Sequence, residues 1–311
     1  MFTISRRGKR IGVGLTAGVA ALAAAAVAHA TLTQVPVMTG PSDQVTPAAA
    51  GDTLTWAHNG SGNGGPMNAY VRVGSGPVVK LNGTGTQGFA GGISGDTVIF
   101  QRLSSGQSDI RLYDASSHTY PALPGGWNTS AWEWRPTISG NLVLFGRQSG
   151  SGTGFTSKIF LGDLATGHLT LLATRTGRYA IAWPGQVNGN YAVWSQCSDT
   201  RISCSVLRYD IAAGTTTVIP NTFGSGKQQY APSVASDGTV YFIHSGSSCG
   251  ASVTLVRQPL AGPKTVLVSF NNGVDVDTTY TDDSTGTPSV YYAKGACAGG
   301  FIQRDIYKVV D

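Results

Sequence analysis

Glutamate is almost absent from this chain of 311 residues: among its 16 acidic side chains, only Glu133 is a glutamate. Charged residues of all kinds make up 12% of the chain, about half of the usual share. Strong helix formers are therefore scarce, whereas 43 glycines and many Ser, Thr, Asn and Asp residues favour turns. This composition favours an all-β fold, and the single glutamate excludes a glycosidase that works with a pair of glutamates.

Excess positive charge is also lacking outside the N-terminal segment, because the excess basic residues lie at the start of the chain. The chain has 21 basic residues, and four of them lie in the first ten positions, namely Arg6, Arg7, Lys9 and Arg10. They are followed by an apolar, Ala-rich run over 11–27 and by Ala28-His29-Ala30. This order is typical of a secretory signal peptide, which we assign to 1–30. A retained membrane anchor is the alternative, because an apolar run of about 17 residues lies at the lower limit for spanning a bilayer.

Beyond residue 30, the chain has 17 basic and 16 acidic residues. No basic patch for nucleic acid remains in this near-neutral segment, so we expect no nucleic-acid partner. Export predicts a secreted or extracytoplasmic location, and we expect a monomer with no stable membrane span after cleavage of the leader. The absence of strong charge favours recognition by shape and stacking.

An internal repeat runs through the rest of the chain. Six segments share a tight-turn pair followed by an alternating strand that ends in an aromatic residue: 51–56, 95–100, 140–145, 189–194, 237–242 and 287–292. The turn pair is Gly-Asp, Gly-Asn or Asp-Gly in the first five segments, as expected for two-residue hairpins. Each repeat reads as four antiparallel strands, and such units in series predict a β-propeller.

The ends of the chain fit a closed ring of six blades. The last repeat stops after its third strand at 305–310, and the segment 31–37 resembles the fourth strands of other repeats. We therefore expect this segment to complete the last blade and to remove an open edge. The prediction is one propeller domain over 31–311, with blades at 41–83, 84–126, 127–176, 177–223, 224–271, and 272–311 plus 31–38. A seventh blade is disfavoured because no residues remain for it.

The repeat unit resembles that of TolB-type propellers within the wider WD-like group. The resemblance rests on a Pro-x-apolar-x-Ser strand, the Gly/Asp turn, the Val-x-Phe strand and a later Asp-Ile-x-x-Tyr-Asp strand, seen at 109–114. It implies the fold for nearly all of 31–311, but propellers host many unrelated functions. TolB proteins are periplasmic partners in envelope complexes and have an additional N-terminal domain without a counterpart here, so their specific role is not carried over.

Four cysteines follow the leader: Cys197, Cys204, Cys249 and Cys297. An even number in an exported chain favours disulfides. Three pairings are open, and we favour Cys197–Cys204 across one hairpin and Cys249–Cys297 between adjacent blades. A metal or redox site is the less favoured alternative, because the Cys-x6-Cys spacing does not match metal-binding patterns.

One face of the ring carries the candidate binding site. Loops between second and third strands share that face with the blade-to-blade connections, whereas the opposite face has mostly tight turns. Aromatic residues beside Arg and Gln recur in these connections, as suits peptide or carbohydrate recognition. The candidate ligand-binding residues are Trp132, Glu133, Trp134, Arg135, Tyr179, Trp183, Gln228 and Tyr230. The alternative is that these aromatics wedge neighbouring blades together.

Catalysis and metal binding receive less support. Asp275 and Asp277 point the same way on a strand and are weak candidates for Ca²⁺, although a solvated lining is the simpler interpretation. No H-E-x-x-H motif or P-loop occurs in the chain. We therefore expect a non-catalytic binding or scaffold propeller without a cofactor, whose partner is a protein, peptide or glycan of the envelope or extracellular space. The alternative is a propeller hydrolase or lyase with an Asp-based, Ca²⁺-assisted site at the channel mouth.

Overall fold

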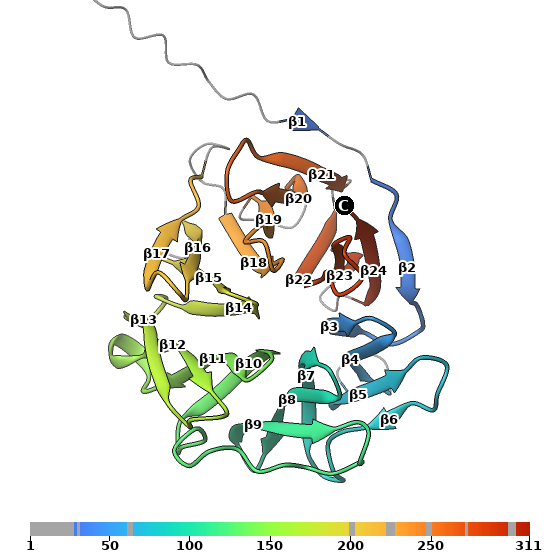
Figure 1. Cartoon of the computed structure of the whole chain (residues 1–311), viewed down its shortest axis with the longest axis vertical. Coiled ribbons are helices and arrows are strands. Elements are labelled where there is room, and N and C mark those ends of the chain that lie inside the picture. The colour runs from blue at the N-terminus through green and yellow to red at the C-terminus, as the bar shows by residue number, and fades with distance from the viewer. Residues whose placement is uncertain are drawn as a thin grey trace, which may run out of the picture.

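The computed structural model describes residues 32–60, 65–198, 203–221, 228–246, 251–270, 273–297 and 303–311, together with the backbone of Ala28–His29. Six β-sheets surround a central axis as the blades of a propeller (Figure 1). The predicted all-β, six-bladed fold is confirmed. Within the described ranges, the only helix is a short 3-10 turn, η1 (Gly152–Gly154), and no helix there is long and apolar enough to cross a membrane.

The first strand of each blade lies nearest the axis, and later strands follow outward (Figure 1). The first blade contains β3 (Gln44–Ala50), β4 (Thr53–Asn59), β5 (Met67–Val73) and β6 (Val79–Lys80). The second contains β7 (Gln87–Ser94), β8 (Thr97–Ser104) and β9 (Gln107–Asp114). The third contains β10 (Trp132–Ser139), β11 (Leu142–Ser149), β12 (Thr156–Asp163) and β13 (Leu169–Thr176).

The remaining blades follow the same order. The fourth contains β14 (Ala182–Asn188), β15 (Tyr191–Cys197), β16 (Cys204–Asp210) and β17 (Thr215–Val218). The fifth contains β18 (Gln228–Val234), β19 (Val240–Ser245), β20 (Val253–Gln258) and β21 (Thr265–Phe270). The sixth contains β22 (Val274–Asp282), β23 (Ser289–Ala296), β24 (Arg304–Val310) and the N-terminal β2 (Val35–Met38).

Two blades depart from the four-stranded pattern. In the second blade, a single bridge between Asp114 and Thr119 stands where a fourth strand would follow β9. In the fifth blade, the short strand β1 (Ala28–His29) pairs in parallel with the outer strand β21. Strand β1 belongs to the segment that the sequence assigns to the leader.

The repeated turn and aromatic residue have distinct physical roles. Gly51, Gly95, Gly140 and Gly189 open the first four hairpins with φ between 54° and 60°, the left-handed region that a glycine adopts without steric cost. The aromatic that ends each second strand is buried: Trp56, Phe100, Phe145, Trp194, Phe242 and Tyr292 are 0–4% exposed. Each belongs to a different one of the six apolar clusters between adjacent blades. The repeat therefore supplies one aromatic residue for every blade interface.

The N-terminal strand closes the ring, as the sequence predicts. Strand β2 pairs antiparallel with β24 through Val35–Lys308, Pro36–Tyr307 and Met38–Ile306. A proline is tolerated there because β2 is an edge strand. The paired strand starts later than the expected 31–37 segment. Before it, the Leu32 amide donates to the Leu267 carbonyl of the fifth blade at 3.1 Å. The leading segment therefore contacts both the fifth and the sixth blade.

Polar side chains connect neighbouring blades on the face of the tight turns. The hydroxyl oxygen of Ser94 accepts a hydrogen bond from the Gly140 amide at 2.8 Å, and Ser139 accepts one from the Gly189 amide at 3.1 Å. Asp282 accepts one from the Gly51 amide at 3.0 Å. These side chains bind neighbouring blades together. On the tight-turn face, polar groups therefore serve the fold, whereas the opposite face has longer loops.

Candidate binding site at the channel mouth

A β-bulge interrupts the innermost strand of every blade. Thr46, Arg135, Ala231 and Thr278 lie at these bulges with φ between 39° and 49°, a conformation that non-glycine residues rarely adopt. Bulges bend a strand and redirect its side chains, and they are common beside binding sites. Here they narrow the channel to a space of about 40 Å³ lined by 46–47, 90–91, 135–137, 184–185, 231–232 and 278–280.

Two glycines are needed where the bulges approach most closely. A Cβ at Gly91 would lie 2.3 Å from the Pro136 carbonyl oxygen, and one at Gly185 would lie 2.4 Å from that of Pro232. Both approaches are too short for any side chain, so the constriction depends on glycine in the second and fourth blades. We call this constriction the collar.

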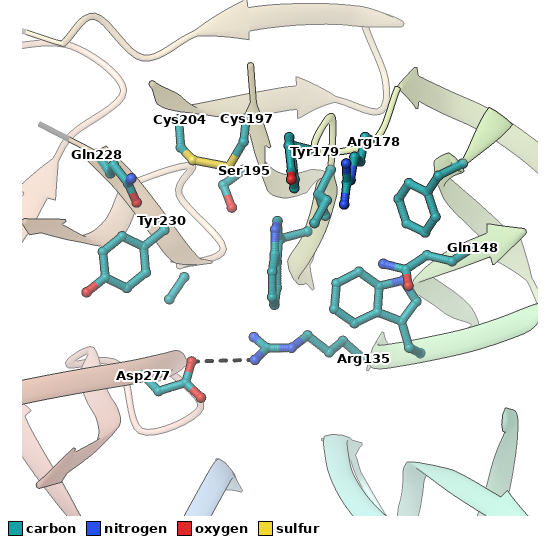
Figure 2. Close-up of a pocket in the computed structure, with 15 residues that line it drawn as sticks. Arg135, Gln148, Arg178, Tyr179, Ser195, Cys197, Cys204, Gln228, Tyr230 and Asp277 are labelled. Carbon is teal, nitrogen blue, oxygen red and sulfur yellow. Dashed lines mark hydrogen bonds and ion pairs between the residues drawn. A yellow bond between two sulfur atoms is a disulfide. The ribbon is translucent and has the colours of Figure 1, made fainter. Parts of the chain in front are cut away.

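A larger cavity of about 660 Å³ lies next to the collar and shares Arg135 and Ala231 with it. Its volume is within the range of small-molecule and peptide sites. The walls come from the beginnings of β10, β14 and β18, the ends of β11 and β15, and β22 (Figure 2). This is the face that the sequence predicts for ligand binding. We call this cavity the mouth pocket.

Six of the eight candidate residues line the mouth pocket: Trp134, Arg135, Tyr179, Trp183, Gln228 and Tyr230. Three residues of the pocket lining, each from a different blade, occupy the same position of the repeat. Trp134, Tyr230 and Asp277 are each the last paired residue before the bulge of their own strand. The sixth blade thus has a carboxylate where the third and fifth blades have an aromatic ring.

The two tryptophans form an edge-to-face pair on one side of the pocket. Their ring centroids are 4.9 Å apart with an interplanar angle of 69°, an arrangement that aromatic quadrupoles favour. Trp134 is only 7% exposed, and its indole packs on Gly146, where a Cβ would lie 2.3 Å from Nε1. Trp134 therefore serves the blade interface as well as the pocket, whereas Trp183 is partly exposed.

Arg135 contacts this aromatic pair and also Asp277 (Figure 2). The guanidinium carbon is 5.0 Å from the Trp183 ring centroid and 5.8 Å from that of Trp134, within the range of cation–π attraction. Nη2 is 3.4 Å from Asp277 Oδ1. Burial would raise the pKa of Asp277, but Arg135 and Arg304 outweigh it and hold that pKa below its usual value. Asp277 is therefore an anion at neutral pH.

A disulfide forms the opposite wall, as the sequence favours. Cys197 and Cys204 face each other as the last pair between β15 and β16, with an S–S distance of 1.99 Å. Cys297 is also disulfide-bonded, and its predicted partner, Cys249, lies outside the described residues. Below the first disulfide, the Ser195 hydroxyl turns toward the pocket interior (Figure 2).

Ser195 and Trp134 each place an unused polar atom in the pocket lining. Ser195 is 0% exposed, and its hydroxyl has no hydrogen-bond partner among the described residues. The Trp134 Nε1–H likewise has none among those residues. Buried polar groups are normally satisfied by protein, water or ligand. Nε1 of Trp134 faces Gly146, so the Ser195 hydroxyl is the one of these two atoms that turns toward the pocket.

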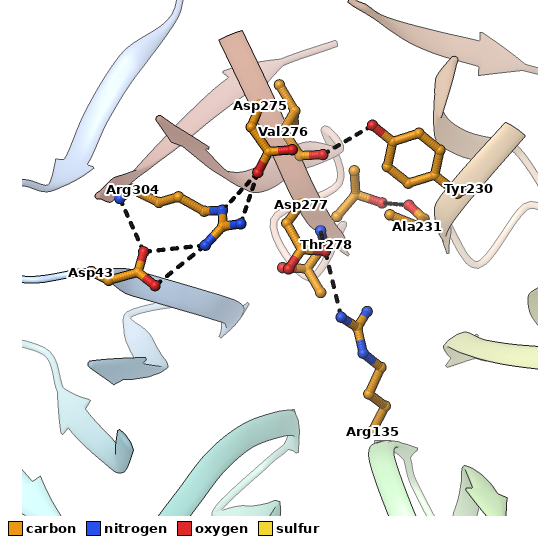
Figure 3. A network of polar contacts seen from close by, with 10 residues as sticks. Asp43, Arg135, Tyr230, Ala231, Asp275, Val276, Asp277, Thr278 and Arg304 are labelled. Atoms are coloured by element: carbon orange, nitrogen blue, oxygen red, sulfur yellow. Dashed lines mark hydrogen bonds and ion pairs between the residues drawn. The ribbon is translucent and has the colours of Figure 1, made fainter. Parts of the chain in front are cut away.

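Tyr230 is held in place from the neighbouring sixth blade. Its hydroxyl donates to the Val276 carbonyl at 3.2 Å (Figure 3), and burial raises the pKa of the phenol. The tyrosine is therefore neutral and fixed in position. Its ring stands across the pocket as a rigid apolar wall.

Two candidate residues lie elsewhere. Glu133 is 0% exposed, and its Oε1 accepts hydrogen bonds from Arg147 Nε and the Thr129 hydroxyl, both at 2.7 Å. It thus fixes the connection that precedes β10 and does not line the mouth pocket. Trp132 lies in a neighbouring hollow beside 105–107 and 148–150, which shares only Gln148 with the described lining of the mouth pocket. Both residues adjoin the pocket residues in sequence. Alternation along β10 directs Glu133 away from Trp134, whereas Trp132 begins the strand and lies beside the loops of the second and third blades.

The two aspartates that the sequence names as calcium candidates are paired with arginines. Asp277 contacts Arg135, and Asp275 Oδ2 lies 2.8 Å from Arg304 Nη2 (Figure 3). Arg304 also contacts Asp43 at 3.3 Å, which links the sixth blade to the first. In the part of the chain that the structure describes, no group of three His, Cys, Asp or Glu side chains is arranged to hold a metal ion.

Several residues of the pocket lining were not predicted from the sequence. Gln148, Phe155, Arg178, Ile181 and Ser195 all line it. Arg178 precedes Tyr179 in one of the aromatic blade-to-blade connections, and Phe155 lies in the long loop after β11. Their positions on the loop face could therefore have indicated both residues. Ser195 had none, because a buried serine inside a strand has no distinctive pattern.

One serine motif lies outside the described residues. The sequence Gly246-x-Ser248-x-Gly250 matches a G-x-S-x-G pattern, but 247–250 are not described. A nucleophile elbow requires a strand-to-helix turn. The only described helix, η1, lies in the third blade.

Comparison with known proteins supports the fold. No protein-family model matches the chain, and no curated protein sequence matches it. Among solved structures, the β-propeller domain of the Trilobed protease from Pyrococcus furiosus matches with a TM-score of 0.55 at 11% identity, covering 87% of this chain and 96% of that one. A putative TolB from Agrobacterium tumefaciens matches with a TM-score of 0.51 at 14% identity, covering 88% and 91%.

A third structure gives a shorter match. TolB from Acinetobacter baumannii matches with a TM-score of 0.49 at 15% identity, covering 79% of this chain and 60% of that protein. The fold is thus similar to that of the putative TolB from Agrobacterium tumefaciens and of the Trilobed protease propeller. At such low identities, the likeness extends to the fold alone.

Proposed function

We propose that this chain is a non-catalytic, extracytoplasmic binding propeller that takes a peptide segment of a partner protein into the mouth pocket. The observation that carries the proposal is the lining of that pocket, where Trp183, Tyr179 and Tyr230 present aromatic surface beside Arg135, Gln148 and Gln228. Binding sites combine an apolar wall with a few polar groups in this way. A disulfide in the same wall is in keeping with an oxidising compartment.

A peptide is favoured over a sugar by the distribution of apolar groups. Sugars stack one face on an aromatic ring, whereas here apolar atoms stand on several sides. Phe155 and Ile181 lie among the residues from the third and fourth blades, and the disulfide and Tyr230 form the opposite wall. A side chain that is surrounded in this way buries more apolar area, which is the main source of affinity.

The pocket also lacks the elements of a hydrolytic site among its described residues. Its lining contains one carboxylate, Asp277, which is bound to Arg135. No described histidine lines it, so the hydroxyl of Ser195 has no base beside it. A nucleophile needs such a base within hydrogen-bonding distance. The described lining thus offers recognition groups without a catalytic pair.

Selection of peptides from a displayed random library on the purified protein tests the proposal. We expect enriched peptides whose affinity falls more than about tenfold in Trp183→Ala, because aromatic anchors dominate interfaces. Trp132→Ala is the matched control, since Trp132 faces a different hollow, and it should bind as the wild type does. Peptides that bind both variants equally well, or no enrichment at all, would refute the proposal.

A further inference from the structure

The charges of the mouth pocket narrow the type of peptide that it can take. Arg135 and Arg178 both line the pocket, against the single carboxylate of Asp277. Arg178 is exposed, and its guanidinium lies 5.3 Å from the Tyr179 ring centroid. The pocket with its rim therefore has an excess of positive charge, which an anionic ligand would complement.

Arg135 has capacity for a second anion. Of its guanidinium nitrogens, only Nη2 has a partner among the described residues, the Asp277 oxygen at 3.4 Å. Its side chain is 22% exposed and faces the pocket. A guanidinium has five N–H donors in a planar fork that suits a carboxylate. Stacking beside Trp183 orients this fork before any ligand arrives.

The collar indicates whether the bound carboxylate belongs to the end of a peptide or to a side chain within it. An extended chain that passed through the pocket would need an exit on the side of the axis, but the channel narrows there to a space of about 40 Å³. Backbone at the six bulges forms the collar, together with prolines of the first, third, fourth and fifth blades and the close approaches at Gly91 and Gly185. A pocket with so narrow a floor accepts the end of a chain more readily than its middle.

We propose that the mouth pocket recognises the free carboxyl terminus of a polypeptide whose last side chain is apolar or aromatic. This inference rests on the proposed function and adds the identity of the recognised group. The terminal carboxylate binds the unused N–H groups of Arg135, and Arg178 adds positive charge at the rim. The last side chain lies among Trp183, Tyr230 and the Cys197–Cys204 disulfide. The hydroxyl of Ser195, which has no partner among the described residues, provides a further hydrogen bond.

Matched peptides separate this inference from the proposed function. The probes are fluorescent pentapeptides with four randomised positions that end in Phe, Leu or Lys, each made as the free acid and as the carboxyl-terminal amide. Fluorescence anisotropy measures their dissociation constants with the purified protein. We expect the free acids ending in Phe or Leu to bind at least about tenfold more tightly than their amides, because a charge-assisted contact is lost on amidation.

Three variants assign the effect to its residue. Arg135→Gln should abolish the preference for the free acid. Arg111→Gln, a matched change at a partly exposed, ion-paired arginine of the second blade, should keep it. Asp277→Asn removes the carboxylate that competes for Arg135 and should tighten binding of the free acids. A thermal melt of each variant establishes that it is folded.

The remaining outcomes refute one or both claims. Equal binding of acids and amides would overturn the carboxyl-terminal inference and leave peptide binding intact. Absence of binding by every peptide would overturn both claims. If D-glucuronate binds in the same assay while the peptides do not, an acidic glycan is the ligand and both claims fail.

Discussion

The two halves of the channel mouth use the same residue types for different purposes. Over the sixth and first blades, Arg304 contacts Asp275 at 2.8 Å and Asp43 at 3.3 Å, and the Arg304 amide also donates to Asp43 at 3.0 Å (Figure 3). Over the third to fifth blades, Arg135 has a single long contact with Asp277. The first arginine is saturated with structural partners, whereas the second keeps donors for a ligand.

The partners of a charged residue, more than its type, therefore distinguish a structural contact from a binding site. The Arg304 cluster lies where the N-terminal segment crosses from β2 to β3, and nearby bonds hold the same crossing. Asp305 accepts a hydrogen bond from the Gly40 amide at 3.1 Å, and Gln303 donates to the Gly40 carbonyl at 2.6 Å. The closure half should therefore control stability, and the pocket half should control binding.

Deleting residues 31–39 should have the largest effect on stability. The deletion removes β2, its pairing with β24 and the apolar contacts of Val37 and Met38, and it opens an edge of the sixth blade. We expect the melting temperature to fall by at least about 10 °C, since about 1 kcal/mol corresponds to a few degrees in a domain of this size. Differential scanning calorimetry measures it, and an unchanged melting temperature would refute closure by β2.

Replacing Arg304 should cost more stability than replacing Arg135. Arg304→Gln leaves two partly buried carboxylates without their cation, so we expect the free energy of unfolding to fall by about 2–3 kcal/mol. Arg135→Gln breaks one long contact and should cost less than about 1 kcal/mol. Urea unfolding of both variants compares them directly, and equal losses would erase the distinction between the two halves.

Removing the pocket disulfide should affect both properties moderately. Cys197 and Cys204 are seven residues apart in sequence, and closing so short a loop stabilises a protein by about 2 kcal/mol in the chain-entropy estimate. The double variant Cys197→Ser/Cys204→Ser should therefore melt a few degrees lower and bind the selected peptides more weakly. Unchanged affinity would show that the disulfide supports the fold without shaping the pocket.

The smallest expected effect is a difference in pH dependence between the two halves. The pKa of Asp277 is lowered in the folded protein. Its ionised form therefore stabilises the fold at pH values above the unfolded-state pKa. This stabilisation is lost as the pH falls through the lowered pKa of the folded state. Burial raises the pKa of Asp43, although Arg304 opposes the shift. The contribution of Asp43 is therefore present below its unfolded pKa and is lost as pH rises through the raised value.

Asparagine variants distinguish the opposite pH dependences of the stability contributed by Asp277 and Asp43. Between about pH 3 and 6, which brackets the usual aspartate pKa, the stability difference between wild type and Asp277→Asn should grow with pH. The corresponding difference for Asp43→Asn should shrink over the same interval. Urea unfolding at several pH values measures both, and parallel trends would contradict the assigned shifts.

Regular features of the sequence predict the fold well. The aromatic that ends each second strand recurs because each blade interface needs one, so Phe145 and Phe242 could be placed from spacing alone. The closing strand could be expected because a ring that lacks an outer strand leaves an open edge. The second blade breaks the pattern, since a single bridge at Thr119 replaces its fourth strand.

The site is less predictable because it depends on distant partners. Arg135 and Asp277 are 142 positions apart, and only closure of the ring brings them together. The sequence placed Asp277 among metal candidates, whereas the structure places it at the same bulge position as Trp134 and Tyr230. Burial also separates neighbours in sequence: Glu133 supports a connection, and Trp134, next to it, lines the pocket.

Peptide binding in the mouth pocket is tested most directly by the dissociation constant of a selected peptide for the wild type, Trp183→Ala and Trp132→Ala, measured by isothermal titration calorimetry. We expect a loss of affinity of more than about tenfold in Trp183→Ala and none in Trp132→Ala. Both variants should keep the melting temperature within a few degrees of the wild type. Equal affinities in all three proteins would contradict the assignment of the mouth pocket as the binding site.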